Sequence, residues 1–350
     1  MNKRPPRNGE ALKKIKNTLL VDGNALFKRA FAGAKDEYND KGEFVGALYQ
    51  FITLVRKMLV EDLYHQVYIF WDGKLSGLER FKIYEPYKSN RNKDFVNLTE
   101  SIDEEQAIQL QKIWSYLNEF YVRQFNYDYI EGDDLIAYYC LNKEPNEKIT
   151  ICTNDTDMAQ LINEDIKIYF LHIKNYVDIN NFSSYFSYHV ENAALIKTMI
   201  GDTSDVIKGI KGLGLKTLLQ HFPQLKEGVL TLNEIIDEAK KLQEQRLTEK
   251  KKPLTVLNNI INGVTDGVQG EKIYEINNRL VNLKYPMISE NAIIELERLK
   301  NGTLDGTGRN IKKIAQYMHE DGIDKIIGEV RNEDYLVPFK KLIEREKNLI

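Results

Sequence analysis

The sequence predicts an α/β protein with a mostly parallel central sheet, helices on both faces of that sheet, and a mainly helical second half. Three observations support this fold class. Short apolar runs alternate with segments of helical spacing in the first half of the chain. Those helical segments supply the long crossovers that parallel strands need. After Val190 the strand signals fade and helical patterns follow.

Four apolar runs have the length of buried strands, and we predict strands at 18–21, 66–71, 149–153 and 165–171. Apolar residues at helical spacing predict helices between them, at 46–60 and 104–120. The second half adds helices at 192–200, 216–222, 232–245 and 271–281. The polar, charged segment 88–105 interrupts the alternation, which indicates a lid or an arch.

Composition places the chain among globular proteins. Hydrophobic residues make up 42% and charged residues 29%, with 8 Pro and 21 Gly, which excludes a disordered or collagen-like chain. The 350 residues suffice for about two domains. Cys140 and Cys152 lie in apolar surroundings, which is typical of buried free thiols. Free thiols fit the reducing cytosol. No run approaches a membrane span or a secretory signal, so we expect a cytoplasmic protein.

Acidic residues stand where the predicted strands end. Asp22 follows the run TLLV, Asp72 follows VYIFW, and Asp155 and Asp157 follow ITICT. Because ligands of open α/β sheets bind at the carboxyl ends of the strands, we expect these carboxylates to share one crevice.

Two more acidic groups stand beside predicted helices. Glu131, Asp133 and Asp134 open the helix LIAYYCL, and Asp202 and Asp205 follow another helix in GDTSD. Helix capping alone would account for acids at a helix start. Taken singly, each of these acids is explained by a cap, a turn or a solvated charge.

As a set, the acids predict a divalent metal site. Several carboxylates in one crevice repel each other by kilocalories unless cations neutralise them. Carboxylate oxygens suit a hard cation such as Mg²⁺ or Mn²⁺, and the five histidines show no metal spacing. A carboxylate-held pair of Mg²⁺ ions supports phosphodiester hydrolysis, because it activates water and stabilises charge on the transferring phosphate.

Basic and aromatic side chains are mixed in segment 79–91, ERFKIYEPYKSNR. This mixture favours a strand of nucleic acid, through phosphate contacts and base stacking, although an ordinary exposed surface has a similar composition. The side chains concerned are Arg80, Lys82, Tyr84, Tyr87, Lys88 and Arg91.

A glycine- and lysine-rich loop, GIKGLGLKT, precedes a predicted helix. Glycine leaves the backbone amides open to a phosphate, and a helix start is electropositive. The loop does not follow a strand as a dinucleotide-binding fingerprint would, so a grip on the backbone of a duplex is the better hypothesis. We predict DNA contacts at Lys208, Lys211, Gly212, Gly214, Lys216 and Thr217, in addition to Arg80 and Tyr87.

Five motifs occur in a fixed order between residues 18 and 225: VDGNALFKRAF, FWDG with RFKIYEPYKSNR, EGDDLIAYYC, TNDTDMAQLI and GDTSDVIKGIKGLGLKT. In this order they resemble the flap endonuclease and 5′-3′ exonuclease superfamily, which has a PIN-like nuclease domain. The later stretch INNRLVNLKYP and its helical tail resemble the phage T-even ribonuclease H branch. The resemblance implies a two-metal 5′ nuclease that removes RNA primers and 5′ flaps in lagging-strand replication or repair.

The resemblance also implies roles for particular residues. Metal binding falls on Asp22, Asp72, Glu131, Asp133, Asp134, Asp155, Asp157, Asp202 and Asp205. Catalytic roles fall on Lys88 and Arg91, at the base of a helical arch, together with Asp22 and Asp72.

Further implications concern DNA and cofactors. Gly212 and Gly214 fall on a helix-three-turn-helix that grips duplex DNA, and Phe27 and Phe31 are candidates to stack near the scissile nucleotide. Two Mg²⁺ ions are expected, with Mn²⁺ as a substitute and K⁺ as a candidate at the helix-three-turn-helix. Expected partners are DNA and RNA–DNA hybrids with a 5′ flap, nick or primer junction. A single-stranded-DNA-binding protein and replication proteins are candidate partners of a monomer without membrane contacts, in the host cytoplasm if phage-encoded.

Four regions are expected. Residues 1–17 form a flexible basic arm, and 18–190 form the PIN-like nuclease domain with its arch near 88–105. Residues 191–285 form a helical DNA-binding domain with the helix-three-turn-helix, and 286–350 form a helical C-terminal extension.

Three other hypotheses stay open. A PIN-type ribonuclease without junction specificity would lack the glycine-lysine loop. A haloacid-dehalogenase-like phosphatase would need a D-x-D signature, whereas Gly23 and Asn24 follow Asp22. A catalytically inactive DNA-junction binding protein would lack site acids, and none is missing.

The net charge of −3 opposes DNA binding only weakly, because 49 basic residues exceed the acids that remain outside the site.

Overall fold

The computed structural model describes residues 15–34, 36–90, 104–266, 270–302, 310–328 and 332–347. Its strands are β1 (Lys16–Asp22), β2 (Gln66–Phe70), β3 (Arg123–Phe125), β4 (Glu147–Thr153), β5 (Ile166–Phe170), β6 (Asn175–Val177), β7 (Gly201–Asp202) and β8 (Ile207–Lys208). In this part of the chain six strands form one sheet in the order β3-β2-β1-β4-β5-β6. All neighbours in it are parallel except β6, which runs antiparallel to β5.

Helices account for most of the remaining chain. The α-helices are α1 (Gly23–Gly33), α2 (Gly46–Glu61), α3 (Leu78–Ile83), α4 (Glu104–Glu119), α5 (Gly132–Leu141), α6 (Ala193–Ile200), α7 (Leu215–His221), α8 (Leu232–Thr248), α9 (Thr255–Asn262), α10 (Lys272–Val281), α11 (Glu290–Asn301), α12 (Ile311–Glu320), α13 (Ile323–Ile327) and α14 (Asn332–Lys347). The 3₁₀ helices are η1 (Thr156–Leu161), η2 (Phe182–Ser184), η3 (Val190–Asn192) and η4 (Pro223–Lys226).

The central strand β1 explains why helices cover both faces of the sheet. Leu19 and Val21 point into a core that includes residues of α1, α2 and α4, whereas Leu20 points into a second core with α5. A parallel strand that is buried on both faces needs an almost continuous apolar run, which is what TLLV supplies. The predicted fold class is therefore confirmed.

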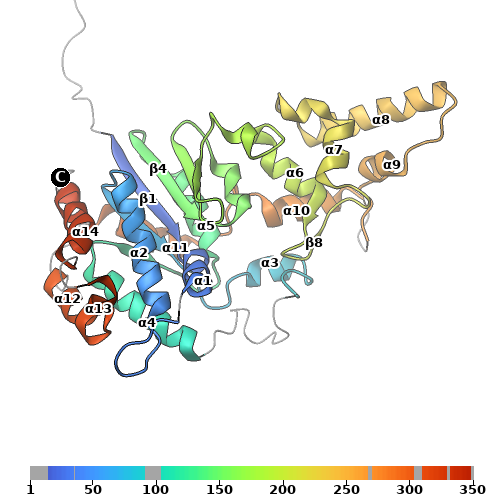
Figure 1. Ribbon diagram of the computed structural model, residues 1–350. Coiled ribbons are helices and arrows are strands. Elements are labelled where there is room, and N and C mark those ends of the chain that lie inside the picture. Colours follow the sequence, from blue (N-terminus) through green and yellow to red (C-terminus); the bar gives the residue numbers. More distant parts are fainter. Residues whose placement is uncertain are drawn as a thin grey trace, which may run out of the picture.

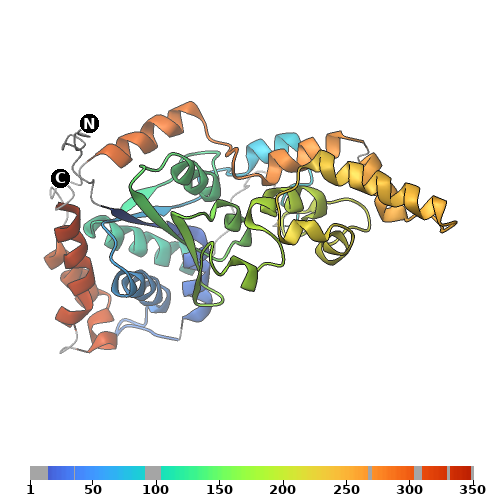
Figure 2. The same ribbon diagram turned by 90° about the horizontal axis from the view of Figure 1, so that it is seen from above.

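The helical second half has a core of its own. Helices α6 to α10 enclose it, with Leu218, Phe222 and Ile235 fully buried. A capping box between Thr231 and Glu234 fixes the start of α8. Figures 1 and 2 show α8 and α9 projecting from the sheet at one end of the molecule, with α12 to α14 at the opposite end.

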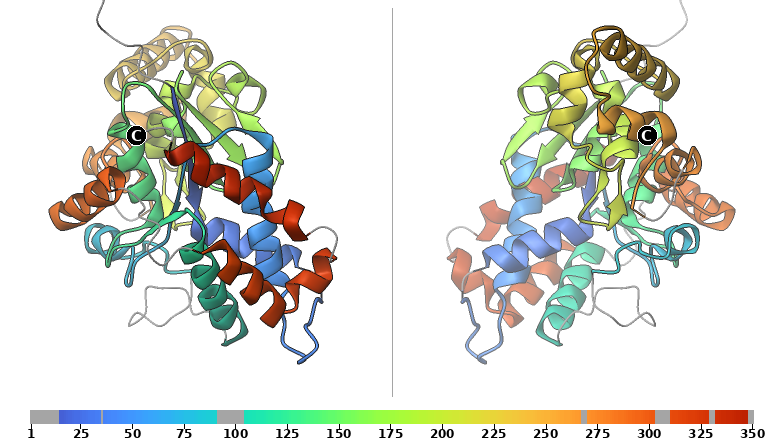
Figure 3. Two further views of the ribbon diagram at one scale, coloured as in Figure 1. Left: turned by 90° about the vertical axis from the view of Figure 1, so that its left-hand side faces the viewer. Right: turned by 90° about the vertical axis from the view of Figure 1, so that its right-hand side faces the viewer.

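The C-terminal helices return to the sheet. Ala292 and Leu296 of α11 join the core beside α5, and Ile314 and Phe339 join the core on the opposite face. The rings of Phe120 and Phe339 stack with centroids 3.9 Å apart. Figure 3 shows the red C-terminal helices beside α2, drawn in blue.

The structure differs from the sequence-based elements mainly at short strands. β1 begins at Lys16, two residues before the predicted start, and the three-residue strands β3 and β6 were not predicted. Residues 1–14 of the basic arm and 91–103 of the arch lie outside the described residues. Cys140 and Cys152 are both buried free thiols, as predicted. Within the described ranges, no helix combines the length and apolarity that crossing a bilayer requires.

Candidate functional site

Three neighbouring strand ends determine where the site lies. β2, β1 and β4 are adjacent and parallel, so they end at the same edge of the sheet. Asp22 is the last residue of β1, Asp72 comes two residues after β2, and Asp155 comes two residues after β4. The amide of Gly132 donates to Asp72 Oδ1 at 2.7 Å, which joins the start of α5 to this edge. The structure thus brings the strand-end acids together as expected.

Asp22 is held in a fixed orientation at the centre of the edge. Its carboxylate caps α1 by accepting a hydrogen bond from the amide of Ala25 at 2.9 Å, and Thr153 Oγ1 donates to its other oxygen at 2.8 Å. Burial raises the pKa of Asp22 to about 6 despite these two hydrogen bonds, and the charges of Asp72 and Asp155 add to the increase.

Asp133 and Asp157 also experience the charge of their neighbours. Burial raises the pKa of Asp133, in the first turn of α5, well above its ordinary value, and Asp155, Asp22 and Asp72 raise it further. Burial and then Asp155 raise the pKa of Asp157, in η1, to about 7. These shifts indicate negative charge that the surrounding protein does not fully compensate.

Glu131 differs from these acids because cations surround it. It accepts hydrogen bonds from Arg80 Nη1 at 2.6 Å and from Tyr87 OH at 3.0 Å. Lys88 Nζ also donates to it and lies 4.0 Å from Asp205 Oδ2. Burial opposes ionisation of Glu131, but Lys88 and Arg80 outweigh burial and hold its pKa at about 2. Lys88 therefore lies at the carboxylate cluster, as the resemblance implied.

Arg80 and Asp134 form a buried pair behind Glu131. Two hydrogen bonds of 2.6 and 3.0 Å join the guanidinium to both oxygens of Asp134, and the amide of Met287 also donates to Asp134 at 2.9 Å. The side chains of Arg80 and Tyr87 are buried, so they do not face a surface that DNA could contact. The structure corrects the DNA contacts expected for these two residues and gives them a supporting role around Glu131.

Lys197 is a site residue that the sequence reasoning missed. Its Nζ lies 2.6 Å from Asp157 Oδ1 and 2.8 Å from Asp202 Oδ2. Burial opposes ionisation of Asp202, but Lys197 and hydrogen bonds from Ser204 hold its pKa at about 2. The signal was a single charged residue in the otherwise uncharged helix AALIKTMI, directly before GDTSD.

The donor set fits a hard divalent cation. Among the described residues, no three ligand side chains stand at the spacing that holds one ion. The acids are nevertheless all carboxylates, and the raised pKa values of Asp22, Asp133 and Asp157 indicate charge that cations would compensate. Lys88 and Lys197 compensate part of it.

Three further residues were predicted for the site. Arg91 is outside the described residues. Phe27 belongs to the core on the α1 side of the sheet, whereas Phe31 is partly exposed and its ring lies 5.9 Å from that of Phe44. Of the two phenylalanines, Phe31 is therefore the more accessible.

The glycine-lysine loop lies between β8 and α7 and contains two kinds of glycine. A Cβ at Gly209 would lie 2.1 Å from the backbone of Ile200, so the fold itself requires that glycine. Positions 212 and 214 have nothing within 4 Å of a Cβ, and only Gly212 has a positive φ, of +78°. Nothing within the described chain requires glycine at Gly214, whose backbone at the start of α7 is left open.

The lysines of this loop face solvent. Lys208, Lys211 and Lys216 are exposed, and Thr217 is half-buried in the first turn of α7. Lys211 Nζ lies 3.0 Å from Asp266, an exposed pair that contributes little to stability. The structure thus presents these cations beside the open glycine backbone.

Comparisons with known proteins agree with this geometry. The family described as 5′-3′ exonuclease, N-terminal resolvase-like domain, matches residues 17–189. A 5′-3′ exonuclease of Mycoplasmopsis pulmonis is 28% identical over 257 residues, which cover 71% of this chain and 80% of that protein. DNA polymerase I of Bacillus subtilis is 28% identical over 239 residues, which cover 66% of this chain but 26% of the polymerase.

Solved structures share the fold. A bacteriophage T5 flap endonuclease, in a pseudo-enzyme–product complex with DNA and metal ions, has a TM-score of 0.54 at 18% identity, covering 87% of this chain and 100% of that one. A zinc-bound T5 5′-exonuclease has a TM-score of 0.55 at 16% identity, covering 88% of this chain and 99% of that one.

The raised carboxylate pKa values predict that metal-free protein loses stability as the pH rises from about 4 to 7. Asp22 has an ordinary pKa of 3.8 and a folded pKa of about 6, so its proton favours the folded state, and this advantage disappears as the pH rises through 6. Asp157 acts in the same direction up to about pH 7. Glu131 and Asp202 have lowered pKa values, so their contribution is lost only at lower pH.

Urea unfolding in EDTA, measured from pH 4 to 8, tests this expectation. Asp22→Asn should flatten the profile and raise the free energy of unfolding at pH 8 by up to about 3 kcal/mol. Asp237→Asn, an exposed acid on α8, is the matched control and should leave the profile unchanged. A wild-type stability that increases steadily to pH 8 would contradict the assigned shifts.

Proposed function

Because the chain belongs to the flap endonuclease and 5′-3′ exonuclease superfamily, we propose that it is a metal-dependent nuclease that cleaves phosphodiesters at 5′ ends and 5′ flaps. One observation carries the proposal: carboxylates from the ends of β1, β2 and β4 and from the start of α5 meet at one sheet edge, with Lys88 beside them. Such an arrangement suits phosphoryl transfer, in which positioning and charge stabilisation supply most of the catalysis.

The residues that would hold metal are the acids with uncompensated charge, Asp22, Asp72, Asp133 and Asp155, joined by Asp157, Asp202 and Asp205. Two Mg²⁺ ions, for which Mn²⁺ can substitute, supply activation of water and stabilisation of charge on the phosphate. Glu131 and Asp134 bind Lys88 and Arg80 in this structure, so we assign them mainly to positioning these cations.

The protein side chains have separable tasks in this proposal. Lys88 supplies a positive charge to the phosphate as negative charge develops there, and Glu131 holds the ammonium in place until substrate arrives. Tyr87 OH orients Glu131. Lys197 keeps Asp157 and Asp202 together. Arg91, for which the resemblance implies a catalytic role, would assist Lys88.

We further propose DNA and RNA–DNA hybrids with 5′ flaps, nicks or primer junctions as substrates, and removal of RNA primers in replication or of flaps in repair as the role. The loop at Gly212 and Gly214 would hold the duplex backbone through its amides and neighbouring lysines, because its surface is open and positively charged. K⁺ at this loop, a single-stranded-DNA-binding protein as a partner, a monomeric state and membership of the T-even branch stay predictions.

Asp155→Asn should lower cleavage by about a thousandfold, equivalent to about 4 kcal/mol of barrier, while leaving DNA affinity nearly unchanged. Asparagine can still cap η1, where Asp155 accepts from the amide of Asp157 at 2.7 Å, so the local fold should persist. Turnover in Mg²⁺ on labelled nicked, gapped, flap and RNA–DNA substrates measures the effect and ranks the activities. Asp237→Asn is the control, and near-normal turnover of Asp155→Asn would remove that residue from the site.

Lys88→Ala should reduce the turnover number by a hundredfold or more and weaken substrate binding by less than threefold, because its charge matters most in the transition state. Lys82→Ala is the matched control, since Lys82 is an exposed lysine of α3 paired with Glu79. Single-turnover kinetics separate the two effects. Weaker binding with unchanged turnover would show that Lys88 contributes only general electrostatic attraction for the substrate.

Gly214→Val should weaken binding of duplex-containing substrates about tenfold without lowering the melting temperature, because a side chain there enters open space in the protein but blocks the amides. Lys211→Ala should weaken binding too and reduce the salt slope by about one. Short single strands, which do not reach the loop, should bind and be cleaved as before. Equal losses on flap and single-stranded substrates would show that the loop supports the fold or the active site.

A further inference from the structure

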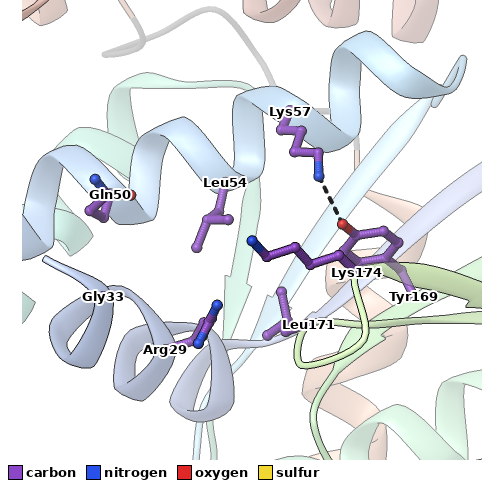
Figure 4. Close-up of a pocket in the computed structure, with 8 residues that line it drawn as sticks. All are labelled: Arg29, Gly33, Gln50, Leu54, Lys57, Tyr169, Leu171 and Lys174. Carbon is purple, nitrogen blue, oxygen red and sulfur yellow. Dashed lines mark hydrogen bonds between the residues drawn. The ribbon is translucent and has the colours of Figure 1, made fainter.

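A basic cavity lies on the α1 and α2 side of the sheet and shares no residue with the carboxylate cluster. It has a volume of about 320 Å³ and opens between α1, α2 and the β5–β6 turn. That volume is at the lower end of the roughly 300–1,000 Å³ typical of ligand pockets. Figure 4 shows Arg29, Lys57 and Lys174 arranged around this space, with Leu54 and Leu171 as apolar wall. We call it the basic pocket.

The charge of the basic pocket is not balanced by its own lining. None of the described residues that line it is acidic. Lys57 donates to Tyr169 OH at 2.9 Å and lies 3.4 Å from Glu61 Oε1, so it is partly neutralised. The side chains of Arg29 and Lys174 make no hydrogen bond or ion pair within the described chain. These two positively charged side chains are therefore available to bind an anion.

The backbone at Lys174 gives a second, independent observation. Lys174 has a φ of +52°, in the left-handed region, and its amide donates to the carbonyl of Phe170 at 2.8 Å to close the β5–β6 turn. Glycine or asparagine adopts this conformation more readily than lysine does. The turn by itself therefore favours another residue, and a lysine at this position directs a cation to the pocket instead.

Helix α1 and a chain of hydrogen bonds connect the basic pocket to the proposed active site. Arg29 is seven residues after Asp22, which caps α1, so it lies about 10 Å further along the helix at 1.5 Å per residue. On the other side, the amide of Leu171 donates to the carbonyl of Thr153 at 3.0 Å, and Thr153 Oγ1 donates to Asp22. Stacked nucleotides advance about 3.4 Å each, so about three of them span this separation.

We propose that the basic pocket binds a backbone phosphate of the nucleic-acid strand, about three nucleotides from the phosphate that is cleaved. This inference rests on the proposed function, because it places the pocket along the path of that substrate. Arg29 offers a planar fork of N–H donors and Lys174 a mobile point charge, a combination that suits a phosphodiester. Leu54 and Leu171 would meet the sugar.

Binding of the full chain to a fluorescein-labelled flap DNA, measured by anisotropy in EDTA over a range of NaCl concentrations, tests the proposal. Arg29→Gln and Lys174→Asn should each weaken binding about three- to tenfold and lower the salt slope by close to one. Asparagine suits the left-handed turn, so Lys174→Asn removes the charge while keeping the backbone. Lys340→Gln, an exposed lysine on α14, is the charge-matched control and should change neither quantity.

Truncated substrates locate the contact. Shortening the strand on one side of the cleavage point to fewer than about three nucleotides should abolish the difference between wild type and the two variants, whereas longer strands should restore it. Unchanged affinity and slope in both variants, or a difference that persists on the shortest strands of both truncation series, would overturn the proposal.

Competing ligands and a parallel assay separate the alternatives. Inorganic phosphate and thymidine 5′-monophosphate are added to wild type and to Arg29→Gln. Suppose that wild type binds inorganic phosphate or thymidine 5′-monophosphate, that Arg29→Gln does not, and that the two proteins bind DNA equally well. The pocket would then bind a free phosphate or phosphate monoester, and the proposed contact with the strand would be overturned. Cleavage in Mg²⁺ is measured alongside. If wild type cleaves none of the substrates, the proposed function fails, whereas intact cleavage with unaltered affinities in the variants refutes the pocket alone.

Discussion

Repulsion between carboxylates gathered at one edge of a parallel sheet is the interaction to which much of the remaining structure responds. The strands β2, β1 and β4 must end together because they are parallel neighbours, so acids at their ends meet whatever the helices do. Burial does not relieve this repulsion. It disfavours the charged form of the carboxylates and so raises the pKa of Asp22, Asp133 and Asp157. Cations from elsewhere in the chain reduce the free-energy cost of gathering these carboxylates.

These cations connect distant segments. Lys88 enters from the segment that follows α3, and its amide also donates to the carbonyl of Asp205 at 2.9 Å. Lys197 enters from α6 and bridges acids of η1 and β7. Glu131 and Asp202, which gain such partners, have lowered pKa values. The pKa of Asp157 is raised although Lys197 contacts it, because burial and the charge of Asp155 outweigh the lysine. The cluster therefore contains both compensated and uncompensated carboxylates.

The sequence was sufficient to predict the sheet, its central strands and the acids at its edge, because strands buried on both faces have continuous apolar runs such as TLLV and ITICT. It was not sufficient for β3 and β6, which are three residues long and take their structure from neighbouring strands. The burial of Arg80 and the place of Lys197 were also beyond prediction. Both depend on which distant segment packs against them, and a basic residue near aromatic residues has the same local pattern on a surface and in a buried ion pair.

The segment from α10 to the start of α11 contacts α3, η1, α6 and β8. Asn277 donates to the carbonyls of Thr198 and Lys208, the carbonyl of Leu280 accepts from Arg80, and that of Val281 accepts from Gln160 at 2.9 Å. Removing this segment would leave several buried polar groups unpaired, at about 1–3 kcal/mol each. These hydrogen bonds connect the sheet to the helical half although each has its own core. A nuclease module transplanted from this chain into another polypeptide must accordingly extend through Met287, which donates to Asp134.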